Sequence, residues 1–313
     1  MNAKAWNAQP NALDEIFFQN DAVSLCLLTN RRAKLMRVVD FRAGPSNAKR
    51  AFVMSLAQRE GMERVFTLVE RDEVATWLKM GFAKEANLPS FYKRSDAFLL
   101  GALVEYEDEP PPRSMSRISV AARRERASEP PPSADASIDM AERTTFHAKK
   151  LFRDAGLKGT AAPKITLIND ADARKAVQVA QRSGKALTGF EVFGRDVERR
   201  HYTISARGGL EWTISIEWQA CFGNVFLEAL TSPRTEAERY AAAAGLTSVC
   251  DKLIDEGMVS CFACAPSDDV SLAYIFLASG FRKTGVLRSH IVAGSSRKDA
   301  IVWSRKLALP SDD

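Results

Sequence analysis

The chain has 313 residues, of which 46% are hydrophobic and 27% are charged, and these fractions are ordinary for a globular protein with room for two domains. The net charge of +5 is mild and gives no clear indication of a nucleic-acid partner, since nucleic-acid binders concentrate basic charge on one face or stripe. No segment approaches the length of a membrane span, and the first residues lack the charged start and apolar run of a secretory signal. We therefore expect a cytoplasmic protein with no membrane partner.

Residues 1–20 show no regular pattern and are expected to form a flexible lead-in. Apolar periodicity and turn residues then predict a first domain over residues 21–104. Its expected elements are strands at 21–28 and 34–41, a helix at 51–61, a strand at 64–69, a short helix at 73–82, and strands at 84–92 and 96–104. Ser46 and Asn47 are the candidate caps of the first helix. Arg64, Lys79 and Lys84 have the pattern of ordinary surface charges.

The loop from Arg42 to Arg50 precedes the first helix and contains Gly44 and Lys49. A glycine and basic residues at a helix start are typical of an anion site, because backbone amides and the helix dipole favour negative charge there. The same residues are also typical of a solvated turn before a helix. We favour the turn.

Residues 105–140 differ in composition from the rest of the chain. Two EPPP blocks flank a basic, serine-rich centre from Arg117 to Arg126, and large apolar residues are few. Such a segment cannot bury enough surface to offset its ordering entropy, so we predict a disordered linker. Its centre is either a plain spacer, which we favour, or a docking segment for RNA, lipid or an acidic protein.

Residues 141–313 are expected to form a second α/β domain, because apolar runs alternate with segments of helical period. Its expected elements are a helix at 141–156, a strand at 164–170, a helix at 170–184, strands at 200–208, 211–219 and 224–233, a helix at 234–257, a strand at 258–266, a helix at 268–281, and strands at 282–292 and 299–307. Alternation along residues 211–219 places Trp212, Ile214, Ile216 and Trp218 on one face of the sheet.

The two domains repeat one order of elements, in which Gly81 and Phe82 correspond to Gly280 and Phe281. That order over residues 224–307, with a strand that ends at Pro233, resembles the GNAT acetyltransferase superfamily. The tail of the chain and residues 64–100 are similar to one branch of it, the beta-lysine N-acetyltransferases. The resemblance implies an α/β fold with a mixed sheet, in which a GNAT fold follows a truncated GNAT-like half repeat.

The resemblance also implies an activity, the transfer of an acetyl group from acetyl-CoA to a small amine or amino acid. It assigns Glu228 as a general base acting through water, although Glu228 can equally be a polar residue on the open face of the sheet. It assigns the backbone N–H groups near Leu230 to the thioester carbonyl. Residues 185–200 occupy the place where GNAT enzymes shape the acceptor pocket.

GNAT enzymes hold the pyrophosphate of acetyl-CoA on a glycine-containing loop before the long helix. The corresponding loop of this chain has no glycine and carries Glu236 and Glu238, while Arg234 and Arg239 are its candidate cofactor-binding residues. Phe276 occupies the position at which many members have a tyrosine acid. Two functions therefore remain: an active N-acetyltransferase, or a catalytically inactive regulatory or scaffolding module that binds a protein partner.

Five cysteines fit a reducing compartment, since an odd number without a dense framework indicates free thiols. Cys261 and Cys264 form a CxxC motif, which zinc and redox sites share. They lie in a predicted strand, where residues three apart point to opposite faces. We therefore expect core packing here and no metal.

Overall fold

The strands of the protein form one large sheet. The computed structural model describes residues 14–20, 23–41, 44–106, 133–155, 162–194, 197–207, 209–219, 221–294 and 296–307. Within these ranges a 13-stranded sheet has the order β1-β2-β3-β4-β6-β5-β12-β13-β11-β10-β9-β8-β7. Most neighbours are antiparallel, and β3–β4 and β10–β11 are parallel. The predicted fold class, α/β with a mixed sheet, is confirmed.

The N-terminal half contains each element predicted for it. Its elements are β1 (Asp14–Gln19), β2 (Ser24–Asn30), β3 (Leu35–Asp40), α1 (Asn47–Arg59), β4 (Arg64–Val69), α2 (Val74–Lys79), β5 (Ala83–Leu88) and β6 (Ala97–Leu103). Ser46 caps α1 by accepting a hydrogen bond from the amide of Lys49. Strand β1 is a correction, because it lies where we expected a lead-in. It pairs with β2, and Phe18 stacks on Phe52 of α1 with ring centroids 4.0 Å apart.

The C-terminal half begins with a long helix. Its elements are α4 (Ala134–Ala155), β7 (Lys164–Ile168), α5 (Asp170–Arg182), β8 (Glu198–Ala206), β9 (Leu210–Gln219), β10 (Asn224–Ala229), α6 (Glu236–Asp255), β11 (Ser260–Pro266), α7 (Val270–Ala278), β12 (Arg282–Ala293) and β13 (Ser296–Lys306). Helix α4 begins earlier than the predicted residue 141, because the hydroxyl of Ser133 accepts a hydrogen bond from the amide of Ala136. Residues 107–132, with the basic centre of the predicted linker, lie outside the described residues.

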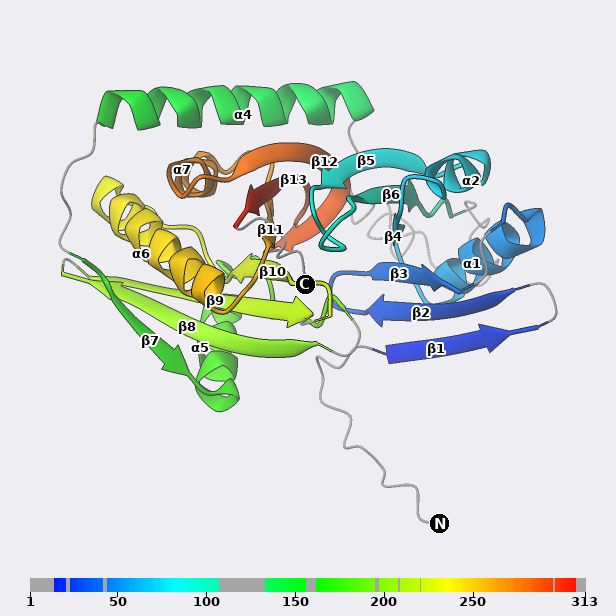
Figure 1. Cartoon of the computed structure of the whole chain (residues 1–313), viewed down its shortest axis with the longest axis horizontal. Coiled ribbons are helices and arrows are strands. Elements are labelled where there is room, and N and C mark those ends of the chain that lie inside the picture. The colour runs from blue at the N-terminus through cyan, green and yellow to red at the C-terminus, as the bar shows by residue number, and fades with distance from the viewer. Residues whose placement is uncertain are drawn as a thin grey trace, which may run out of the picture.

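Three apolar cores show how the sheet is folded. Helices α1 and α2 cover one half of the sheet, and α6 and α7 cover the other, with α4 running across α7 (Figure 1). Trp212, Ile214, Ile216 and Trp218 all face the core beneath α6, as predicted. The third core lies on the opposite face of the sheet and combines residues of both halves, such as Phe66 and Phe226. The sheet therefore bends so that the face opposite α1 and α2 packs against the face opposite α6 and α7, which also carries α5.

The bend lies between β5 and β12, which pair through Ala86 and Gly285. A Cβ atom on Gly285 would lie 2.2 Å from the backbone oxygen of Glu85, so only glycine allows this approach. The expectation that Arg64 is a surface charge is wrong, because its side chain is fully buried beside Glu85. Arg64 also donates a hydrogen bond of 2.8 Å to the backbone oxygen of Arg288 on β12. Arg64 therefore links the two halves through its hydrogen bond to Arg288.

The predicted repeat is visible in the backbone after α2 and α7. Gly81 and Gly280 both have φ of +81°, a conformation that favours glycine. The next residue closes each helix in the same way: Phe82 donates from its amide to the Trp77 oxygen, and Phe281 donates to the Phe276 oxygen. The ends of α2 and α7 thus match in backbone geometry, and each half contributes its penultimate strand to the junction.

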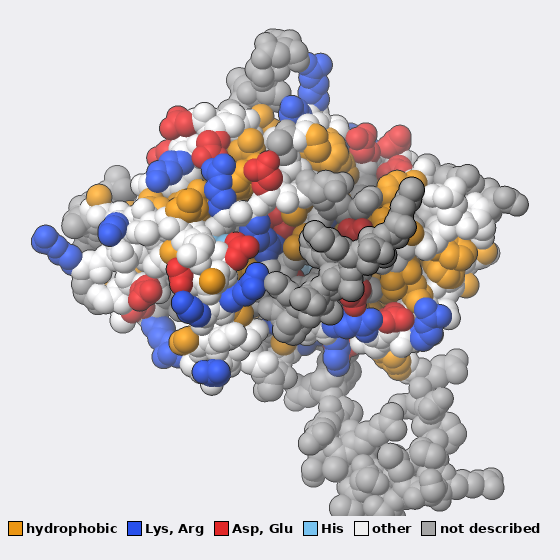
Figure 2. Space-filling view, turned by 90° about the horizontal axis from the view of Figure 1, so that it is seen from below, with side chains coloured by type: hydrophobic (Ala, Val, Ile, Leu, Met, Phe, Trp, Pro, Cys, Tyr) orange, Lys and Arg blue, Asp and Glu red, His pale blue; other side chains and the backbone are white. Residues whose placement is uncertain are grey.

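One face of the described surface carries charges of both signs (Figure 2). On the face in Figure 2, lysine and arginine side chains are interspersed with aspartate and glutamate. None of the helices in the described ranges is long and apolar enough to cross a membrane.

Candidate functional site

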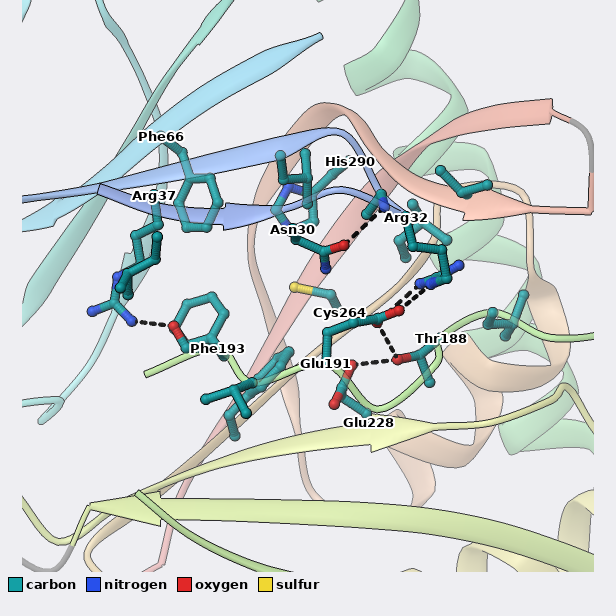
Figure 3. A pocket seen from close by; sticks show the side chains of 18 of the residues that line it. Asn30, Arg32, Arg37, Phe66, Thr188, Glu191, Phe193, Glu228, Cys264 and His290 are labelled. Carbon is teal, nitrogen blue, oxygen red and sulfur yellow. Dashed lines mark hydrogen bonds and ion pairs between the residues drawn. The ribbon is translucent and has the colours of Figure 1, made fainter. Parts of the chain in front are cut away.

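A cavity of about 90 Å³ lies between the two halves, on the face of the sheet opposite α6 and α7. Its lining residues come from β2, β3 and their turn, from β4, from residues 187–193, and from β10, β11 and β12. Aromatic rings of Phe66, Phe193 and Phe226 form much of the apolar wall. Figure 3 shows the polar side chains that face it, with Arg32 and Glu191 on one side and Glu228 below.

Glu228 is the carboxylate at the end of strand β10. The registered parallel pairing of β10 and β11 ends at Leu227 and Ala263, so Glu228 stands where the two strands part. Its side chain is 13% exposed, and its Oε1 accepts a 2.5 Å hydrogen bond from the Thr188 hydroxyl. Among the described residues Oε2 has no hydrogen-bond partner, and the Arg199 guanidinium lies 3.7 Å away. Burial raises the pKa of Glu228 to about 7, and Arg199 opposes this rise.

The loop from Leu187 to Gly194 brings a second carboxylate to the cavity. Glu191 accepts hydrogen bonds from the Gly189 amide at 3.1 Å and from the Thr188 hydroxyl at 3.4 Å. Phe190, which lies between Gly189 and Glu191 in the sequence, has φ of +57°, which is unusual for a residue other than glycine. The backbone is held in this conformation because the amide of Phe190 donates to the Thr188 hydroxyl at 2.9 Å.

Arg32 reaches this loop from the N-terminal half. Its guanidinium forms a two-armed ion pair with Glu191, through Nε to Oε1 and through Nη2 to Oε2. Burial works to raise the pKa of Glu191, but the hydrogen bond and charge of Arg32 outweigh it and lower that pKa. Glu191 is therefore the ionised carboxylate of the cavity.

Glu217 and Arg199 hold the other end of the loop. Glu217 accepts hydrogen bonds from the amides of Phe193 at 2.9 Å and Gly194 at 2.7 Å, and from Arg199 at 2.5 Å. Arg199 also donates at 2.7 Å to the backbone oxygen of Glu191. The loop is thus fixed at several points before any ligand enters.

Cys264 and His290 complete the polar lining. Burial raises the pKa of Cys264 to about 12, so this thiol stays protonated. Burial, together with Arg64 and Arg297, holds the pKa of His290 well below its usual range, so the imidazole is neutral. Cys261 lies in the core on the opposite side of the sheet, which confirms that the two cysteines of the CxxC motif face opposite sides. The described residues contain no cluster that could hold a metal ion.

The start of helix α6 is the place where the resemblance puts a pyrophosphate. One oxygen of Glu238 accepts hydrogen bonds from the amides of Arg234 at 2.6 Å and Thr235 at 3.1 Å, and the Thr235 hydroxyl accepts from the amide of Glu238. The helix therefore binds its own carboxylate with the amides that an anion would use. Arg239 lies 5.9 Å from the Tyr274 ring. The residues at this helix start do not fit a diphosphate in the conformation described.

Leu230 follows strand β10, and its backbone amide already forms a hydrogen bond within the protein. Its amide donates a 3.0 Å hydrogen bond to the Thr213 oxygen on β9. Amides alternate in direction along a strand, so the amide of Ala229 points the other way, towards β11 and the gap between the strands. Ala229 lines the cavity, whereas a ligand contact at the Leu230 amide would require that bond to break. Phe276 is fully buried and stacks on Trp303, so it offers no acid.

The repeat shows what the N-terminal half lacks. Aligning the parallel pairs places Val39 at the position of Glu228, so this half has no equivalent carboxylate. Lys49 takes the place of Glu238 in the first turn of α1, and its ammonium group forms a buried ion pair with Asp40. In the alternative of an anion site in this loop, which we did not favour, the ammonium group of Lys49 is therefore already paired with a carboxylate of the protein.

No model of a protein family matches the sequence, and no curated protein sequence matches it. Solved structures that resemble the chain include N-acetyltransferases. The ribosomal-protein-S18-alanine N-acetyltransferase of Escherichia coli is 14% identical, with a TM-score of 0.37, over 48% of this chain and 97% of that chain. The spermidine N-acetyltransferase of Vibrio cholerae, solved with CoA and spermine, is 11% identical, with a TM-score of 0.38, over 47% of this chain and 96% of that chain.

Proposed function

We propose that the chain is an N-acyltransferase of the GNAT type that acts on a small amine in the cavity, with Glu228 as general base. One observation carries the proposal. Glu228 has a pKa of about 7, lines the cavity where two parallel strands part, and has one oxygen without a hydrogen-bond partner among the described residues. A base whose pKa lies near the working pH combines the correct protonation state with a useful affinity for the proton.

The residues of the cavity can remove a proton from an amine, which makes the amine a nucleophile. A small amine enters as an ammonium ion, and the carboxylate of Glu228 accepts one of its protons. The nitrogen is then left with the lone pair that acyl transfer to an amine requires. The rings of Phe66, Phe193 and Phe226 keep this proton transfer away from bulk water. The start of α6 does not fit the pyrophosphate of acetyl-CoA in the conformation described.

The test is the variant Glu228→Gln, which keeps the shape of the side chain and removes the base. Acetyl transfer from acetyl-CoA to a panel of small amines and amino acids would be followed in the full chain. We expect kcat/KM of the wild type to rise as the pH passes about 7, and the variant to lose roughly 100-fold or more. Glu211→Gln on the same sheet is the control, since Glu211 is exposed. Equal rates for Glu228→Gln and the wild type would rule out this role.

A second function, an inactive fold that binds a protein partner, is favoured by the Glu238 contacts at α6. A calorimetric titration with acetyl-CoA and with CoA separates the two. Micromolar binding at about one site supports the enzyme. No binding at millimolar ligand, from a folded sample, supports the inactive module.

A further inference from the structure

A chain of polar contacts runs from the N-terminal half to Glu228. Arg32 binds Glu191 with both arms of its guanidinium, Glu191 contacts the Thr188 hydroxyl, and this hydroxyl donates to Glu228 at 2.5 Å (Figure 3). Arg32 and Glu191 are 159 positions apart in the sequence. The contact between them is therefore a property of how the two halves meet.

Arg32 is itself held in place. The turn between β2 and β3 is closed by the Asn30 side chain, which accepts a 2.9 Å hydrogen bond from the amide of Ala33. Arg297 on β13 binds the backbone oxygen of Ala33 and forms a 2.6 Å ion pair with Glu63, the residue before β4. Arg32 therefore leaves a fixed turn, and its side chain is only 24% exposed.

The Thr188 hydroxyl connects two carboxyl groups with a single proton. It donates that proton to Glu228 when Glu228 is ionised. When Glu228 is protonated, the carboxyl proton can point at the Thr188 oxygen while the hydroxyl turns to Glu191, 3.4 Å away. The second arrangement requires Glu191 to be an acceptor, and therefore ionised. Arg32 supplies the positive charge that keeps it so.

We propose that Arg32 is a positioning residue, through which the N-terminal half holds Glu191 ionised and in place and so keeps Glu228 able to exchange its proton near neutral pH. The proposal rests on the function proposed above for Glu228. It gives the N-terminal half a part in the site of the C-terminal half, in place of a second site of its own.

Without Arg32, Glu191 and Glu228 would be two buried carboxyl groups with one shared hydroxyl between them. Such pairs retain one proton to higher pH, because two negative charges this close repel each other. The other ionisable groups around Glu228 come from several elements and stay in place: Arg199 on β8, Glu217 on β9, Cys264 on β11 and His290 on β12. The change would thus come from Glu191.

The experiment is a titration of Glu228 by NMR in the full chain, with glutamate labelled by ¹³C at the side-chain carboxyl and the resonance assigned with Glu228→Gln. We expect the midpoint to move up by about one pH unit or more in Arg32→Gln. The matched control is Arg31→Gln, which removes the same charge from the next position. The partners of Arg31, Asp14 and Glu60, lie outside the cavity lining, so its midpoint should equal that of the wild type.

A double variant tests the route. If Arg32 acts through Glu191, then Arg32→Gln/Glu191→Gln has the midpoint of Glu191→Gln alone, below that of the wild type. An unchanged midpoint in Arg32→Gln, in a sample that melts cooperatively, overturns the proposal. If Arg32→Gln does not fold, an unchanged midpoint in Glu191→Gln overturns it as well. The titration needs no acyl donor, so a wild type without acetyl transfer contradicts only the proposed function.

Discussion

Glu228 binds its proton more tightly in the folded chain than in the unfolded one. Its pKa is raised from the ordinary value of 4.5 to about 7, so the stability linked to this proton is complete below pH 4.5 and is lost as the pH rises through 7. The neutral side chain of Glu228→Gln avoids that loss. We expect the variant to exceed the wild type in stability at pH 8, by up to about 3 kcal/mol, and to match it near pH 4.5.

Urea unfolding of both proteins at pH 4.5 and pH 8 measures this difference. Glu211→Gln, on an exposed position of β9, is the control and should show no dependence of this kind. A stability difference that is the same at both pH values would mean that Glu228 has the same pKa in the folded and the unfolded chain, and that its surroundings are more polar than the cavity indicates.

The sequence predicts Glu228 as a candidate site residue, but it does not predict the neighbours of Glu228 in the cavity. Its position at the end of a strand and the resemblance identified it, whereas Thr188 and Glu191 lie in a loop without apolar period. Their T-x-x-E spacing is that of a capping box and could have indicated a self-bonded loop. Arg32 carries no local signal, because its partner comes from the other half of the chain.

At the scale of the element, a variant of helix α6 can show whether the start of this helix binds an anion. Glu238→Ala would free the amides of Arg234 and Thr235, at a cost of about 1 kcal/mol for the lost cap. If this start is the pyrophosphate site, CoA should bind more tightly to the variant. Glu236→Ala is the matched control, since Glu236 accepts from the Tyr240 hydroxyl and removing it also takes away one charge.

Calorimetry with CoA compares the three proteins. Tighter binding to Glu238→Ala than to Glu236→Ala would show that the amides matter beyond the charge. Equal affinities for the wild type and both variants would place any CoA site elsewhere.

The elements themselves were largely predictable. Period and turn residues located the strands and helices, and the cap of α1 at Ser46 lies where the sequence indicated. Strand β1 was not predicted because, among the described strands, it pairs with β2 alone and four of its six residues are exposed, which leaves little apolar pattern. The start of α4 was missed because its first turns contain small and charged residues, and only Ser133 marks it.

At the scale of the whole molecule, the two halves share one sheet, and no local pattern predicts that. The junction depends on Gly285, which admits the backbone of β5, and on Arg64, which resembles a surface charge in the sequence. Both act through contacts between distant residues. The repeat could be predicted, but the way in which its two copies face each other across a cavity could not.

Replacing Arg64 should weaken the coupling between the two halves. Arg64→Met would leave Glu85 buried without its cation, and the loss of one partner of a buried pair costs roughly 3–5 kcal/mol. Because Arg64 also binds the Arg288 oxygen on β12, we expect the halves to uncouple and the urea transition to broaden or divide. Lys84→Met, on the exposed side of β5, is the control and should change stability little. In Arg64→Met/Glu85→Gln no charge remains buried, so much of the lost stability should return. A single unshifted transition in Arg64→Met would mean that the apolar core between the halves is sufficient to hold them together.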